Sequence, residues 1–216
     1  MATNLFKEAL KAVEHFHSPR ALAFSLLGLH AYLKKFSGDS DVRRILEIIS
    51  LRLYDQFKGN AKPDWPWLEE ALNYVNGKLS HALLLSGQLM QNRDMIDMGL
   101  QSLTWLVEIQ TDNEHFSPVG NMGWYRQNGS RARFDQQPIE THAMIDACIE
   151  AYNITGDSTW IDKAVMCFNW FLGQNDLNMV LYDPRTGGCR DGLMADGINQ
   201  NEGAESTLAC LLSHLT

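Results

Sequence analysis

Carboxylic acids gather at the points where three of the predicted helices begin. The three segments are DWPWLEE at residues 64–70, RFDQQPIE at 133–140 and NQNEGAEST at 199–207. Paired carboxyl groups can supply the acid and the base, or the nucleophile, of glycoside hydrolysis. We therefore predict Glu140 and Glu205 as the catalytic pair, with Asp135 and Glu69 as alternates.

Aromatic, amide and guanidinium side chains occupy the same segments and the loops around them. Flat rings pack on the C–H faces of a sugar, and bidentate polar groups bind its hydroxyls. This combination favours a polyhydroxylated ligand, and we predict a carbohydrate. The candidate binding residues are Trp65, Trp67, Asn76, Trp124, Tyr125, Arg133, Gln137, Arg190, Asp191 and Asn201.

Each of these assignments has a structural alternative. Acids in the first turn of a helix complement the helix dipole and cap free N–H groups. Trp65 and Trp67 can pack at the rim of their own helix. Asp135 and Arg133 can pair with each other, or with Arg131, and hold the loop closed. The sequence leaves these alternatives open.

Apolar residues recur every three or four positions along almost the whole chain, which predicts helices rather than strands. The predicted helices span about 4–16, 19–36, 40–58, 67–90, 93–111, 137–155, 158–173 and 203–215. Connections after the second, fourth and sixth helices are short, whereas those after the third, fifth and seventh are long, at 59–66, 112–136 and 174–202. Alternate connections between antiparallel helices lie at one end of the stack. The sequence therefore predicts an all-α row of helical hairpins without significant β-sheet, with its long loops at one end.

Composition narrows the class of protein. The chain has 216 residues, 45% of them hydrophobic, and we expect a single domain over residues 1–216. A net charge of −8 disfavours nucleic acid and anionic membranes as partners. We expect neither a signal peptide nor a membrane span, and a cytoplasmic location.

Cysteine and histidine patterns exclude the simplest metal sites. The cysteines are Cys148, Cys167, Cys189 and Cys210, and their spacing contains no C-x-x-C motif. The seven histidines form no H-x-x-x-H pattern. We expect no metal and no cofactor, and we interpret the cysteines as packed, reduced thiols.

Several strings together carry a resemblance to a known family. They are WPWLE at 65–69, YVN at 74–76, GWY at 123–125, RARFDQQPIE at 131–140, TGGCRDGL at 186–193 and NQNEGAEST at 199–207. From about residue 20 onward the chain resembles the bacterial (α/α) helical-barrel domain of the six-hairpin glycosidase type. That domain often follows a retaining glycosyltransferase domain.

The resemblance implies an (α/α) toroid that handles carbohydrate at its loop-rich end, with a glycosyltransferase domain or protein as a partner. Two features depart from the family pattern. Val75 stands where many relatives carry an aspartate between tyrosine and asparagine. Eight predicted helices make about four hairpins rather than six, so the toroid is smaller or open, or lacks hairpins at the N-terminus.

The sequence therefore supports three hypotheses of function. The first is a glycoside hydrolase-like enzyme, and the second is a non-catalytic sugar-binding domain that assists a glycosyltransferase. The third is a sugar epimerase or isomerase, for which His115 and His142 are the histidine candidates. A homodimer that covers the apolar edges of an incomplete toroid is a further expectation.

Overall fold

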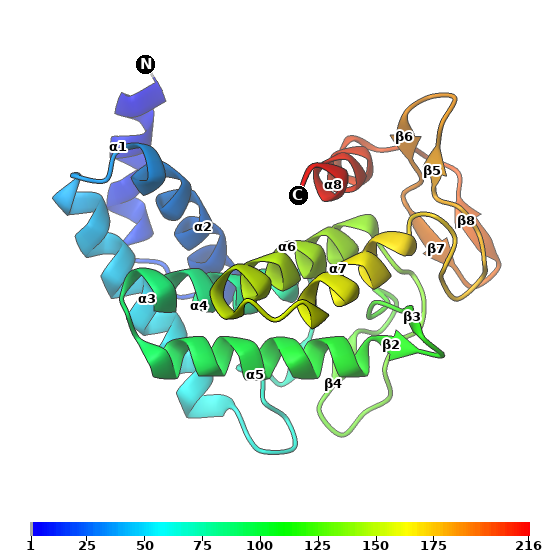
Figure 1. Ribbon diagram of the computed structural model, residues 1–216, viewed down its shortest axis with the longest axis horizontal. Coiled ribbons are helices and arrows are strands. Elements are labelled where there is room, and N and C mark those ends of the chain that lie inside the picture. Colours follow the sequence, from blue (N-terminus) through cyan, green and yellow to red (C-terminus); the bar gives the residue numbers. More distant parts are fainter. Residues whose placement is uncertain (1) are drawn as a thin grey trace. The chain divides into compact units, whose positions relative to one another are not determined.

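A computed structural model describes residues 2–216, and their side chains from residue 4 onward. Over these residues the helices are α1 (Ala2–Val13), α2 (Pro19–Lys35), α3 (Ser40–Asn60), α4 (Gly77–Leu89), α5 (Arg93–Ile109), α6 (Pro138–Thr155), α7 (Thr159–Asn169) and α8 (Ala204–Leu215) (Figure 1). The strands are β1 (Ala71–Leu72), β2 (Thr111–Asp112), β3 (His115–Phe116), β4 (Tyr125–Arg126), β5 (Tyr182–Asp183), β6 (Gly188–Cys189), β7 (Gly192–Met194) and β8 (Gly197–Asn199).

The chain divides into two compact units. The first unit contains residues 1–68 and 78–101, and the second contains residues 69–77 and 102–216. None of the helices among the described residues is long and apolar enough to cross a membrane.

The first unit is built on the α2–α3 hairpin. Apolar positions spaced by three and four residues bury one face of each helix, including Leu22, Leu26 and Leu29 of α2. Asp39 accepts a hydrogen bond from the backbone N–H of Val42 at 3.2 Å and so caps the start of α3. The short connection and the cap together reverse the chain, as the sequence predicts.

Small residues bring α4 and α5 close together within the same unit. A Cβ added at Gly87 would lie 2.7 Å from a side-chain carbon of Ile96, and one at Gly99 would lie 3.0 Å from the side chain of Leu84. Any larger residue at Gly87 would therefore push the two helices apart.

The second unit has α6 at its centre. Pro138 fills the first turn of this helix, and most of the side chains along it are buried. The helix packs against both α7 and α8. Gly156, in the left-handed region at φ 71°, ends α6, and its N–H donates to the carbonyl of Tyr152 at 2.8 Å.

The prediction of an all-α toroid of helical hairpins without significant β-sheet is wrong. The described residues contain four two-stranded antiparallel sheets beside the helices, so the fold is mixed. They pair β1 with β4, β2 with β3, β5 with β6, and β7 with β8. Strands of two or three residues are too short to show an alternating pattern in the sequence.

Turn chemistry explains where these hairpins form. Asn113 and Glu114 connect β2 to β3 and both have positive φ, as a type I′ turn requires. The carboxylate of Asp183 accepts the backbone N–H of Arg185 at 2.9 Å, and Gly187 at φ 74° completes the turn into β6. Gly197 at φ 144° opens β8 after the β7 turn.

Candidate functional site

Segment 69–77 contacts the N-terminal turns of both α6 and α8 in the second unit. The backbone N–H of Val75 donates to Glu140 Oε1 at 2.6 Å. The hydroxyl of Tyr74 donates to Glu205 Oε2 at 3.1 Å. A Cβ at Gly77 would lie 2.6 Å from the carbonyl oxygen of Ala143, so glycine permits this close approach to α6. We call Tyr74, Glu140 and Glu205 the Tyr74 cluster.

The two carboxyl groups of the Tyr74 cluster lie in different environments. Glu140 is 4% exposed, whereas Glu205 is an exposed residue. Burial raises the pKa of Tyr74 to about 12, helped by the charge of Glu205, its hydrogen bond and the charge of Glu140. The phenol therefore stays protonated and donates its hydrogen bond, and the negative charges of both carboxylates help to keep it protonated.

Backbone strain accompanies this arrangement. Val75 is a β-branched residue with φ 54°, a conformation that such residues rarely adopt. The residue is fully buried, and its N–H is aimed at Glu140. The surrounding packing therefore imposes the conformation that delivers this donor to the carboxylate.

Asp135 forms a separate acidic position. Burial raises the pKa of its carboxyl, and hydrogen bonds from Asn121 and Gln137 only partly offset that effect. Gly192 packs against it closely enough that a Cβ there would lie 3.0 Å from Asp135 Oδ1. The predicted binding residue Gln137 thus holds Asp135, and the peptide bond that precedes Asp135 is cis.

Arg133 pairs with the buried carboxylate of Asp176, a residue that was not a candidate from the sequence. Its Nε donates to Asp176 Oδ1 at 2.8 Å, and its Nη2 lies 3.3 Å from Asp112 Oδ2. Gln136 donates through Nε2 to the other oxygen of Asp176, and the indole N–H of Trp170 donates to Gln136 Oε1 at 2.8 Å. We call Arg133, Gln136, Trp170 and Asp176 the Asp176 cluster.

Electrostatics identify the Asp176 cluster as a structural centre. The Asp176 side chain is fully buried, which by itself would raise its pKa. Hydrogen bonds from Gln136, Ser117 and Arg133 outweigh burial and lower the pKa of Asp176. The alternative in which Arg133 pairs with Asp135 is not what the structure shows, because Arg133 pairs with Asp176.

Arg190, Asp191 and Asn201 hold the hairpins of the second unit to the start of α8. Arg190 donates to Asp183 Oδ2 and lies 2.9 Å from Glu202 Oε1. Asp191 accepts the backbone N–H of Gly203 at 2.7 Å and the side-chain amide of Asn201. These polar groups, predicted to bind a ligand, are engaged within the protein.

The remaining candidates divide into buried and half-exposed residues. Trp65 is 4% exposed and Trp67 is fully buried, where it packs edge-on against Phe57 at 5.5 Å between ring centroids. Asn76 is also buried, and its side chain bonds both backbone groups of Asn73. These three residues are therefore part of the packed interior rather than of a ligand-binding surface.

Trp124 and Tyr125 keep part of their surface in solvent. Tyr125 pairs with Leu72 across the β1–β4 ladder, next to the segment that carries Tyr74. Glu69 is half-buried and precedes β1. The prediction that it opens a helix is wrong, because α4 begins only at Gly77.

The histidine candidates lie beside other acids. His115 Nε2 is 3.7 Å from Asp176 Oδ1. His142 Nε2 is 3.5 Å from Asp146 Oδ2, and its Nδ1 is 3.3 Å from the hydroxyl of Ser213. Among the described residues, no group of three or more histidine, cysteine or acidic side chains is arranged to hold a metal ion.

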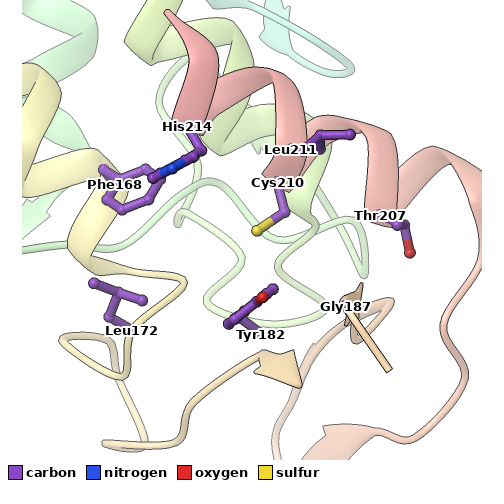
Figure 2. Close-up of a pocket in the computed structure, with 8 residues that line it drawn as sticks. All are labelled: Phe168, Leu172, Tyr182, Gly187, Thr207, Cys210, Leu211 and His214. Atoms are coloured by element: carbon purple, nitrogen blue, oxygen red, sulfur yellow. The ribbon is translucent and has the colours of Figure 1, made fainter. Parts of the chain in front are cut away.

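A cavity of about 510 Å³ lies elsewhere in the second unit (Figure 2). Its walls come from the end of α7, the β5–β6 hairpin and α8, and they include Phe168, Leu172, Tyr182, Cys210 and His214. The lining is largely apolar, and the predicted carboxylates do not contribute to the described walls. The cavity is therefore distinct from the Tyr74 cluster.

Comparison of the chain with protein-family models and with curated proteins found no match. The chemistry of the side chains is therefore the basis for assigning a function.

Sequence reasoning selected Glu140 and Glu205, which the structure brings to one phenol, but it did not select that phenol. Tyr74 lies within a string that carries the family resemblance, yet no local signal indicates that its hydroxyl donates to Glu205, 131 residues further along the chain. Asp176 and Gln136 were also missed. Gln136 follows Asp135 directly, and a polar residue buried beside a candidate acid is the signal that could have identified it.

Proposed function

We propose that the second unit binds a glycan at the Tyr74 cluster and cleaves a glycosidic bond there. The observation that carries the proposal is the convergence of Glu140 and Glu205, from two different helices, on one phenol. Two carboxyl groups in unlike environments can take the two roles that glycoside hydrolysis requires.

Different contacts suit the two acids to different roles. Glu205 is exposed and accepts a hydrogen bond from Tyr74, so it can exchange a proton with solvent and with a leaving group. Glu140 is fixed by the Val75 N–H, so it can present a carboxylate of defined orientation to the sugar ring. Trp124 and Tyr125, both half-exposed, are the rings on which the sugar would pack.

The test begins with a glycan panel screened by thermal shift and by mass spectrometry of released products. Glu140→Gln keeps an oxygen that can accept the Val75 N–H but removes the charge. We expect this variant, and Glu205→Gln, to lose turnover by about 10²- to 10⁴-fold on the glycan that the wild type cleaves.

Glu70→Gln is the matched control, because Glu70 is an exposed acid of the same segment outside the cluster. It should retain wild-type turnover. Full activity of Glu140→Gln on the same glycan would refute the catalytic proposal.

Binding without bond cleavage is the second candidate. It is favoured by the internal engagement of Arg133 with Asp176 and of Asp191 with the Gly203 N–H, which leaves fewer groups to orient a substrate for bond cleavage. Calorimetry would then detect glycan affinity that Glu205→Gln weakens, while no product appears over days.

A further inference from the structure

The cysteines of the second unit form two pairs that differ in their access to solvent. Cys148 of α6 and Cys167 of α7 are close enough for the charge of one to affect the other, and both are fully buried. Cys189 of β6 is also fully buried, whereas Cys210 of α8 is 7% exposed and lines the 510 Å³ cavity. All four are free thiols.

Strand register places Cys189 on the face of the hairpin that meets α8. Tyr182 pairs directly with Cys189 across the β5–β6 ladder, so their side chains share one face of the hairpin. Tyr182 lines the same cavity as Cys210, and Figure 2 shows the Cys210 sulfur on the side of α8 that faces Tyr182. Cys189 therefore lies on the hairpin face that packs toward the side of α8 that carries Cys210.

A backbone hydrogen bond fixes the alignment of strand and helix. The N–H of Cys189 donates to the hydroxyl of Thr207 at 3.2 Å. Thr207 lies one turn before Cys210 on the same face of α8, which brings the Cys210 side chain over β6. Strand β6 packs against α8 at this point, so Cys189 and Cys210 lie on two elements in contact with each other.

We propose that Cys210 and Cys189 form a reversible redox site, in which Cys210 reacts first with a hydroperoxide and Cys189 then closes a disulfide. The disulfide would tie the β5–β6 hairpin covalently to α8. The Cys148–Cys167 pair, sealed between α6 and α7, does not take part.

The chemical steps balance with hydrogen peroxide as the oxidant. The Cys210 thiolate attacks one peroxide oxygen, the O–O bond breaks, and the released hydroxide takes a proton to give water and a sulfenic acid on Cys210. The Cys189 sulfur then attacks the Cys210 sulfur, the S–O bond breaks, and the leaving hydroxide takes the Cys189 proton as a second water. Two thiols are oxidised by two electrons, and one peroxide is reduced.

The local electrostatics agree with this order of reaction. The hydrogen bond with Cys189 lowers the pKa of Cys210, and the same contact, followed by burial, raises the pKa of Cys189. Burial raises the pKa of Cys148 to about 12 and that of Cys167 above its ordinary value. Thiolate character is therefore concentrated on the one cysteine that lines the cavity.

The experiment treats the folded protein with hydrogen peroxide, counts thiols after unfolding and maps disulfides by peptide mass spectrometry. We expect two of the four thiols to be lost, in a linked peptide pair that contains Cys189 and Cys210, and dithiothreitol to restore them. The oxidised protein should also melt several degrees higher, roughly as expected for a new cross-link.

Variants test the order of reaction. Cys189→Ser should stop at a sulfenic acid on Cys210 that dimedone traps, and Cys210→Ser should give neither the sulfenic acid nor the disulfide. The double variant Cys148→Ser/Cys167→Ser is the matched control and should oxidise as the wild type does. Circular dichroism verifies that each variant is folded, and the wild-type peptide map decides the question if one is not.

Three results would overturn the proposal. They are the absence of a Cys189–Cys210 disulfide, dimedone labelling of Cys189 ahead of Cys210, and oxidation of the Cys148–Cys167 pair at a comparable rate. None of these readouts depends on glycan turnover.

Discussion

The Asp176 cluster and the Tyr74 cluster are both built around carboxylates of the second unit. The two clusters differ in how many hydrogen bonds these carboxylates accept and in how far they are buried. Asp176 is fully buried, and both of its oxygens accept side-chain hydrogen bonds, one from Arg133 and one from Gln136. In the Tyr74 cluster, Glu205 is exposed and accepts a hydrogen bond from the phenol of Tyr74. The first cluster is closed, and the second has a carboxylate that faces solvent.

This difference separates a stabilising role from a chemical one. A buried carboxylate whose oxygens are all engaged stabilises the fold, and its removal leaves its partners unsatisfied. A carboxylate that remains in solvent can bind or exchange a proton with a ligand. We therefore expect removal of the Asp176 carboxylate to lower the stability strongly and removal of the Glu205 charge to lower it only slightly.

The largest expected effect on stability is at Asp176. Asp176→Ala leaves Gln136 and Arg133 without their acceptor, and we expect the free energy of unfolding to fall by about 3 kcal/mol, near the low end for a broken buried pair because Arg133 is 51% exposed. Urea denaturation measures this loss. Asp196→Ala, at an exposed aspartate before β8, is the control, and equal losses in both variants would contradict the closed-cluster interpretation.

An intermediate effect is expected at alkaline pH. The folded-state pKa of Tyr74 is raised to about 12, so its stabilising contribution is complete below the unfolded pKa, near 10, and is lost as the pH rises to about 12. Stability measured between these two limits should fall with pH in the wild type.

Glu205→Gln tests the cause of this alkaline dependence. The variant removes a nearby negative charge, so the Tyr74 pKa should be lower and the stability should fall less steeply. NMR titration of the labelled tyrosine ring reports the pKa directly. An unchanged Tyr74 titration in this variant would show that Glu205 does not contribute to the raised pKa.

The smallest expected effect is on the stability of Glu205→Gln at neutral pH. An exposed side chain with one neutral hydrogen-bond partner contributes about 0.5 kcal/mol or less. Thermal unfolding of Glu205→Gln, measured together with Asp176→Ala, compares the stabilising contributions of the two clusters. A loss as large as that of Asp176→Ala would assign Glu205 a structural role.

Local signals predicted the helix boundaries that proline and glycine mark. The starts of α6 and α8 fall within one residue of their predicted positions, because Pro138 and the residues after Gly203 mark them. The helix predicted from residue 67 begins instead at Gly77. Trp65, Trp67 and Leu72 are buried without a helix, so their apolar pattern was mistaken for helical periodicity.

The sequence predicted that the long loops would meet, and within the second unit two of them do. Gln136 and Leu193 exchange backbone hydrogen bonds, and Arg133 reaches Asp176. The loop at 59–66 belongs to the first unit. The polar residues of the loops were assigned to a ligand because a sequence does not show which charges will find partners in the same protein.

The sequence by itself determined most of the helices and the mostly apolar character of their buried faces. These features depend on neighbours within a few positions, for which periodicity, proline and glycine are sufficient signals. Only the tertiary structure decided that Tyr74 donates to Glu205, that Arg133 pairs with Asp176 and that Cys189 bonds Thr207 of α8. Each of these contacts joins residues far apart in the chain, and packing of the whole unit fixes which of the available partners each group meets.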